Sequence, residues 1–175
     1  MNFKEEKLSS RVVYDGKILK LEVDKVRLPD GSESVRECVR HSGGAAVLLI
    51  AENKVALVKQ YRYLYGKEIY EIPAGKMEEG EDPAVAAMRE CEEETGYRAQ
   101  VKHLVDIYPS PGYTDEIIHI YLAECGEFKG QYTDEGEFLT CEFVPFEKVV
   151  QMIESGEICD AKTVVAIYKY LALRL

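Results

Sequence analysis

Three glutamates are placed where they could hold a divalent cation. Glu90, Glu93 and Glu94 lie within five consecutive residues, so on a helix they share one side. Like charges at these spacings disfavour a helix by about 0.2–0.5 kcal/mol per pair, and negative charge in a last turn opposes the helix dipole. A cation bound among the carboxylates would offset both costs. A solvated acidic face is the alternative explanation of the same residues.

The helix that carries these glutamates has clear signals at both ends. Asp82 is a good N-cap, and Pro83 suits the first helical position because its missing N–H is not needed there. Gly96 can take the left-handed conformation that commonly ends a helix. An apolar stripe with i, i+3, i+4 and i+7 spacing consists of Ala84, Ala87, Met88 and Cys91. The sequence therefore predicts a helix between Pro83 and Gly96 with one face packed inward.

The helix belongs to a longer pattern of fixed spacing in residues 75–97. The charged and glycine positions of that pattern are Gly75, Glu81, Arg89, Glu90, Glu93, Glu94 and Gly96. In order and spacing it resembles the Nudix box, the signature of hydrolases that cleave a diphosphate linked to another group. Cys91 and Tyr97 stand where aliphatic residues are usual, and both are apolar enough to pack.

The resemblance implies a metal site. Mg²⁺, with Mn²⁺ as a substitute, would be held by the carboxylates of Glu90 and Glu94 and by the main-chain carbonyl of Ala74, since Mg²⁺ prefers hard oxygen ligands. Glu93 is implied as a further ligand with a part in catalysis, and a solvent-facing role is its alternative. The structural positions of the box are Gly75, Glu81, Arg89 and Gly96, and Arg89 is expected to orient the glutamates.

Other segments resemble the ADP-ribose pyrophosphatase subgroup. They are residues 59–63 with 71–76, residues 110–116, residues 134–137 and residues 156–163. The resemblance implies Mg²⁺-dependent hydrolysis of ADP-ribose to AMP and ribose 5-phosphate. Another nucleoside diphosphate sugar or a dinucleotide is the alternative substrate. Outside enzymes, the alternative is a nucleotide-binding module on the same scaffold.

The subgroup also implies functional residues outside the box. The general base is Glu135 or, as the alternative, Glu137, both in the 134–137 loop. Substrate contacts are expected from Arg62, Glu71 and Pro111. The planar guanidinium of Arg62 suits bidentate contact with a phosphate group, and a surface salt bridge is the alternative role.

Composition and charge argue against several partners. The 175-residue chain is 46% hydrophobic and 31% charged, with a formal net charge of −10. More than half of the negative excess falls within residues 75–97, and no basic stripe offers a path for nucleic acid. The longest aliphatic stretch, Ala45–Ala51, is too short to cross a bilayer. The first residues lack the apolar segment of a signal peptide, and the five cysteines are scattered, so we expect a cytoplasmic protein.

The remaining pattern predicts an α/β fold. Strands are expected at 45–50, 55–60, 68–72, 101–107, 117–123 and 138–144, and helices from Pro145 to about Ser155 and after Asp160. The resemblance implies an α/β/α sandwich with a mixed sheet over residues 41–175. Residues 1–40 are expected to add a small antiparallel β region of two strands, which builds a homodimer. A change of phase between Val23 and Val26 suggests a bulge there.

Overall fold

The structure is a computed structural model that describes residues 2–133 and 136–174. The chain forms two compact units. The first unit comprises the chain up to Gly43 together with Tyr108–Ile117. The second comprises Gly44–Ile107 and the chain from Ile118 onward.

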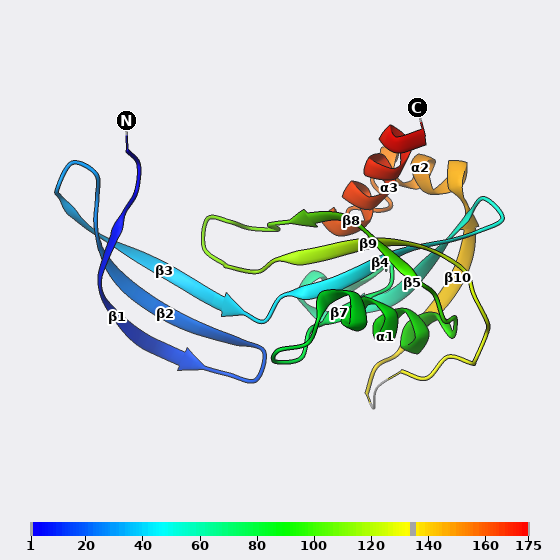
Figure 1. Ribbon diagram of the computed structural model, residues 1–175, viewed down its shortest axis with the longest axis horizontal. Helices are drawn as coiled ribbons and strands as arrows, with labels where there is room; N and C mark the ends of the chain where they lie inside the picture. Colours follow the sequence, from blue (N-terminus) through cyan, green and yellow to red (C-terminus); the bar gives the residue numbers. More distant parts are fainter. Residues whose placement is uncertain (1, 134–135, 175) are drawn as a thin grey trace. The chain divides into compact units, whose positions relative to one another are not determined.

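The first unit is built on a three-stranded antiparallel sheet (Figure 1). Its strands, in spatial order, are β1 (Glu6–Asp15), β2 (Leu19–Arg27) and β3 (Glu33–His41). Two strands were predicted here, and β1 is an addition. The predicted bulge in the second strand is wrong: β2 pairs with β3 without a register shift, and Val23 and Val26 face opposite sides of it. The irregularities lie in the pairing of β1 with β2.

The segment Tyr108–Ile117 is fastened to β3 within the same unit. The Val39 N–H donates to the Tyr113 carbonyl at 2.7 Å, and the Asp115 N–H donates to the Val39 carbonyl at 3.2 Å. Arg40 adds a side-chain bond from Nη1 to the Asp115 carboxylate at 3.0 Å. The segment therefore extends the small sheet although it lies between two strands of the second unit in sequence.

The second unit contains a mixed sheet, as predicted. Its strands are β4 (Gly44–Ala51), β5 (Lys54–Arg62), β6 (Lys67–Glu71), β7 (Ala74–Lys76), β8 (Val101–Ile107), β9 (Ile118–Glu124) and β10 (Leu139–Pro145). The main order is β10-β5-β4-β9-β8, with β6 beside β5 and β7 beside β4. Only the pairing of β4 with β9 is parallel in the described sheet. A short 3-10 helix, η1 (Tyr63–Tyr65), follows β5.

Three helices cover the two faces of this sheet, so the predicted α/β/α arrangement is confirmed. They are α1 (Pro83–Thr95), α2 (Phe146–Glu154) and α3 (Ala161–Arg174), visible in green, orange and red in Figure 1. Buried side chains alternate along β4: Val47 packs with α1, and Leu48 packs with α2 and α3. This alternation is what a strand covered on both faces requires. In the described part of the chain, each helix falls short of the length and apolarity needed to span a lipid bilayer.

Candidate active site

The predicted helix forms as α1, with the predicted residues at both ends. The Asp82 carboxylate accepts hydrogen bonds from the N–H groups of Ala84 at 2.9 Å and Val85 at 3.2 Å. Gly96 has a φ of 79°, in the left-handed region, and its N–H donates to the Glu92 carbonyl at 2.9 Å. A Cβ at Gly96 would also meet the Phe128 ring at 2.6 Å. Glycine is therefore required there both for backbone conformation and for space.

Glu94 is a buried carboxylate held by the main chain of β7. Its exposed fraction is 4%, and Oε2 accepts a hydrogen bond from the Ala74 N–H at 2.8 Å. Within residues 2–133 and 136–174, no lysine, arginine or histidine forms an ion pair with it. Burial raises the pKa of Glu94 to about 8, and the negative charges of Glu90 and Glu137 raise it further. A desolvated carboxylate in this state favours a bound cation.

Glu90 lies one helical turn before Glu94 and shares its surroundings. Burial raises its pKa, against the opposing effect of a hydrogen bond from Arg89. The charges of Glu93 and Glu137 act in the same direction as burial. Two carboxylates thus lie together in a poorly solvated place, next to the main chain of β7. This donor set of hard oxygens fits Mg²⁺.

Gly75 leaves the space that the Glu90 carboxylate fills. A Cβ built at residue 75 would coincide with the carboxyl atoms of Glu90. Gly75 also pairs with Ala45 in the short ladder between β4 and β7, so its backbone has little freedom to move away. The glycine is therefore explained by close approach of a side chain, not by an unusual backbone conformation.

We expect Gly75→Ala to displace Glu90 and to weaken Mg²⁺ binding by at least about tenfold, because one ligand can no longer reach its place. Isothermal titration with Mg²⁺ measures the change. Gly80→Ala, in the turn after β7, is a comparison that strains the backbone, because φ is 77° there, but does not displace Glu90, because a Cβ at residue 80 meets nothing within 4 Å. Equal Mg²⁺ affinity in Gly75→Ala and wild type would show that Glu90 is not a ligand.

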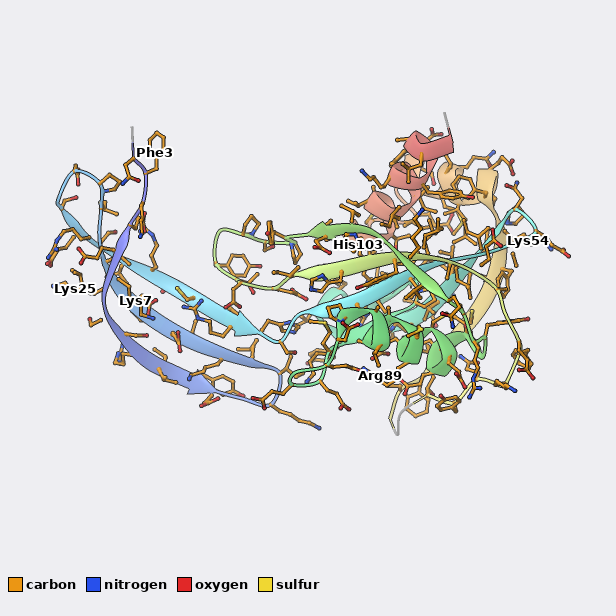
Figure 2. The ribbon with its side chains drawn as sticks, viewed as in Figure 1. Phe3, Lys7, Lys25, Lys54, Arg89 and His103 are labelled. Carbon is orange, nitrogen blue, oxygen red and sulfur yellow. The ribbon has the colours of Figure 1, made fainter. Side chains whose placement is uncertain are left out.

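Arg89 ties the acidic groups of the box together. Its guanidinium donates to Glu81 at 3.1 Å through Nε and Nη2, and to the Lys76 carbonyl at 3.2 Å. Nη1 donates to Glu90 at 2.7 Å and to Glu93 at 3.0 Å. Figure 2 shows Arg89 projecting from α1. One side chain therefore connects the loop before the helix with two glutamates of the helix.

The position of Glu93 differs from that of the other two glutamates. Its carboxylate accepts from Arg89 as that of Glu90 does, but its side chain is more exposed, at 20% against 12%, and its backbone carbonyl accepts a hydrogen bond from the Tyr132 N–H at 3.0 Å. Across the described residues, no three His, Cys, Asp or Glu side chains are gathered at metal-binding distances. A cation at Glu90 and Glu94 would therefore complete its shell with oxygens such as the Ala74 carbonyl and water, as Mg²⁺ usually does.

The loop after β9 is fastened to the end of α1. The Gln131 side-chain amide donates to the Glu94 carbonyl at 2.8 Å, and the Lys129 N–H donates to the Gly96 carbonyl at 2.7 Å. These bonds satisfy carbonyls that a helix end leaves without partners. Further along, Thr133 Oγ1 donates to the Glu137 carbonyl at 3.2 Å. The negative charge of Glu137 contributes to raising the pKa values of Glu90 and Glu94. Glu135, the other candidate base, lies outside the described residues.

Arg62 and Glu71 form one unit of structure. Glu71 is 2% exposed, and its oxygens accept from Arg62 Nε at 2.6 Å and Nη2 at 2.7 Å. Lys162 Nζ donates to the same carboxylate. Glu71 was predicted to contact substrate; in the structure its carboxylate is buried and accepts from Arg62 and Lys162. Arg62 remains part-exposed, and the negative charge of Glu94 contributes to raising the pKa of Arg62. Pro111 lies in the first unit, whereas the other candidate residues lie in the second.

Two residues of this site were not foreseen. Lys162 is the second residue of α3, where a positive charge opposes the helix dipole, and Gln131 caps α1 from a distant loop. The misplaced charge of Lys162 is a signal that the sequence does contain. The role of Gln131 has no local signal, because it depends on a contact across 37 residues.

Mg²⁺ binding near neutral pH is expected to release about one proton, because a carboxyl with a pKa of about 8 is mostly protonated at pH 7 and must ionise to bind metal. A raised pKa in the folded state favours folding below pH 4.5, and this contribution is lost as the pH rises through about 8. Mg²⁺ affinity should therefore rise with pH over that interval. Calorimetry in buffers of different ionisation enthalpy counts the protons, and binding without proton release would contradict the assignment of Glu94.

Comparison with known proteins identifies the family. Residues 40–165 match the NUDIX domain, and residues 5–39 match the nucleoside diphosphate sugar hydrolase N-terminal domain. The chain therefore belongs to the Nudix family of hydrolases, as the box predicted. A Bacillus methanolicus protein named methanol dehydrogenase activator is 45% identical over 98% of this chain and 95% of its own length. A Bacillus subtilis (strain 168) protein named ADP-ribose pyrophosphatase is 43% identical over 99% of this chain and 95% of its own length.

A solved structure supports the same fold. The crystal structure of an ADP compounds hydrolase superposes with a TM-score of 0.85, covering 97% of this chain and 94% of that chain. Its sequence is only 20% identical. The shared architecture therefore confirms the predicted Nudix fold with its additional N-terminal sheet.

Proposed function

We propose that this Nudix hydrolase is an ADP-ribose pyrophosphatase that yields AMP and ribose 5-phosphate. The observation that carries the proposal is the buried Glu94 carboxylate, which lies beside Glu90 and has no ion-pair partner within the described residues. The near-complete match to a Bacillus subtilis protein named ADP-ribose pyrophosphatase supports this choice of substrate.

Glu90, Glu94 and the Ala74 carbonyl would hold Mg²⁺, with Mn²⁺ as a substitute. When bound, the ion neutralises the diphosphate and makes its phosphorus more electrophilic. The Ala74 N–H, bonded to Glu94 at 2.8 Å, keeps the carboxylate beside the main chain of β7. Arg89 fixes Glu90 from the other side at 2.7 Å. The protein thus supplies a fixed pair of ligands before substrate arrives.

Arg62 is proposed to contact the diphosphate. The guanidinium is held in one orientation by two bonds to the buried Glu71, and a fork of this shape suits phosphate oxygens. Its side chain is 40% exposed, so it remains accessible. Glu71 acts by orienting Arg62 and not by touching substrate.

Water then attacks one phosphorus, and the P–O bond to the bridging oxygen breaks. The water proton passes to a carboxylate base, and the second phosphate leaves as part of ribose 5-phosphate or AMP. We assign the base to Glu137, whose charge acts on Glu90 and Glu94, with Glu135 as the alternative. Proton transfer of this kind contributes typically about 100- to 10,000-fold to rate.

Glu137→Gln is therefore expected to lower kcat by about 100-fold or more while Mg²⁺ affinity is kept. Single-turnover kinetics and Mg²⁺ titration separate the two effects. Glu127→Gln supplies a control from the same connection, because Glu127 is exposed and pairs with Lys129. An unchanged kcat in Glu137→Gln would move the role to Glu135.

A panel of substrates tests the proposed specificity. Purified protein with Mg²⁺ is incubated with ADP-ribose, ADP-glucose, GDP-mannose, NADH, FAD and nucleoside triphosphates, and products are identified by chromatography. ADP-ribose should be hydrolysed with the highest kcat/KM. A better nucleotide sugar or dinucleotide would keep the chemistry and change the substrate. Tight binding without turnover on any of them would favour a nucleotide-binding module.

A homodimer in the cytoplasm is the proposed working form. The small sheet of the first unit carries exposed apolar side chains, among them Val12, Val13, Tyr14 and Val35. Such a surface is typical of an interface between protein chains. All five cysteines are free, which suits a reducing compartment. Light scattering after gel filtration should give twice the 19.8 kDa mass of the chain, and a monomer at micromolar concentration would contradict the dimer.

A further inference from the structure

A buried charge network lies behind Arg62 and has no assigned role. Glu71 and Lys162 are 2% and 8% exposed. The Glu71 carboxylate accepts from both Arg62 and Lys162, and Lys162 Nζ also donates to Asp160 at 3.0 Å. Two cations and two anions therefore balance one another. Buried charges of this kind are costly unless each one is paired. Substituting one member of the network therefore shows what its charge contributes to the other three.

The network is bonded to the chain that leads into the metal site. Thr163 Oγ1 accepts from the Ile72 N–H at 2.8 Å and donates to Asp160 Oδ2 at 2.6 Å. Ile72 is two residues before Ala74, whose N–H donates to Glu94. The first turn of α3 is thus bonded to residues 71–74. This segment contains Glu71, which accepts from Arg62, and Ala74, whose carbonyl is the proposed metal ligand.

Lys162 sets the net charge of the network that a ligand at Arg62 would meet. Glu71 uses Nε and Nη2 of Arg62, and Nη1 has no hydrogen-bond partner within the described residues. Without Lys162, Arg62 would be the single cation of the network beside Glu71 and Asp160, and the remaining charges would be net negative. With Lys162 the four charges cancel, so the network adds no net negative charge near Glu94, where an anionic substrate would bind.

We propose that Lys162 is a positioning residue for diphosphate binding, acting through Glu71 on Arg62. It keeps the guanidinium oriented, and its charge prevents the network from becoming net negative beside the bound diphosphate. The inference rests on the proposed function in one respect, namely that Arg62 contacts the diphosphate of the substrate. The proposed role explains why Lys162, a buried cation, occupies the first turn of α3, where the helix dipole disfavours positive charge.

The test compares charge variants of Lys162 by binding and by kinetics. Inorganic pyrophosphate with Mg²⁺ is titrated calorimetrically into wild type, Lys162→Gln and Lys162→Arg, and KM and kcat are measured on ADP-ribose. Lys162→Gln should weaken pyrophosphate binding and raise KM by about tenfold, with kcat changed by less than about threefold. Lys162→Arg should stay within about threefold of wild type, since it keeps the charge. Lys169→Gln, an exposed lysine of the same helix, controls for the chemical change.

The double variant Glu71→Gln with Lys162→Gln separates charge from packing. It removes one anion and one cation, and the glutamine at 71 can still accept a bond from Arg62. We expect pyrophosphate affinity within about threefold of wild type, although both native side chains are gone. A double variant as weak as Lys162→Gln would overturn the proposal in favour of a packing role. So would a folded Lys162→Gln with wild-type affinity, or wild type that binds no pyrophosphate.

Unfolding of Lys162→Gln can be distinguished from a failure of the proposed charge effect, and both can be distinguished from a failure of the proposed function. If Lys162→Gln unfolds, the pyrophosphate affinity of the double variant tests the proposal, because glutamine at residue 71 leaves no unpaired buried carboxylate there. Pyrophosphate binding needs no turnover. Wild type that binds pyrophosphate but does not hydrolyse ADP-ribose would therefore contradict the proposed function while the binding comparison still tests Lys162.

Discussion

Glu94→Gln is expected to abolish most turnover while the fold remains intact. The carboxylate is 4% exposed and raised to a pKa of about 8, so at neutral pH the metal-free protein already carries it mostly protonated. Glutamine has nearly the same shape and can still accept the Ala74 N–H. Loss of a metal ligand should lower kcat/KM by about 100- to 1,000-fold, since metal stabilisation of charge is worth several kcal/mol.

The measurement is steady-state turnover of ADP-ribose over a range of Mg²⁺ concentrations, together with thermal unfolding. Glu92→Gln is the matched control: it makes the same change on the same helix, at a residue that pairs with Arg98 at 2.9 Å. The control should keep near-wild-type activity. Wild-type turnover in a folded Glu94→Gln protein would remove Glu94 from the metal site.

Arg89→Met is expected to give the largest loss of stability. Arg89 is bonded to Glu81, Glu90 and Glu93, and the three carboxylates are at most 20% exposed. Removing the guanidinium leaves them close together without counter-charge, and breaking such a pair typically costs about 3–5 kcal/mol when buried. Because Arg89 itself is 29% exposed, we expect about 2–4 kcal/mol. Denaturant unfolding of the metal-free protein measures it.

Arg98→Met is the comparison for Arg89→Met. Arg98 lies just beyond the same helix and pairs with one glutamate, but its side chain is 62% exposed, so its loss should cost no more than about 1 kcal/mol. Mg²⁺ should recover part of the stability lost in Arg89→Met, because it neutralises Glu90 and Glu94. Equal effects of the two substitutions would mean that Arg89 does not hold the glutamates together.

Features governed by local physics were predictable from the sequence. The ends of α1 follow from Asp82, Pro83 and Gly96, whose conformational preferences act within a few residues. The buried strand β4 follows from its continuous apolar run, and the α/β class from the alternation of strands and helices, whereas the mixed sheet was implied by the resemblance to the Nudix family. The acidic last turn of α1 pointed to a cation because it contradicts the helix dipole.

Features that depend on distant contacts were not predictable. β1 contains Lys7, Ser9, Ser10 and Arg11, a poor strand pattern that is stabilised by pairing with β2 along its length. No local signal indicates that Lys162, 91 residues after Glu71, bonds to the Glu71 carboxylate. Gly75 was recognised from its motif, whereas its reason, the space for Glu90, becomes visible only in three dimensions.

We propose that the protein hydrolyses the diphosphate of ADP-ribose and that Glu90 and Glu94 of α1 would hold the divalent cation it needs. The most direct test is to incubate wild-type protein with ADP-ribose after chelation with EDTA, then add Mg²⁺ and follow the products by chromatography. We predict no turnover with EDTA, and rapid formation of AMP and ribose 5-phosphate in equal amounts once Mg²⁺ is present. Products formed equally well with EDTA, or ADP-ribose left intact with Mg²⁺, would contradict the account.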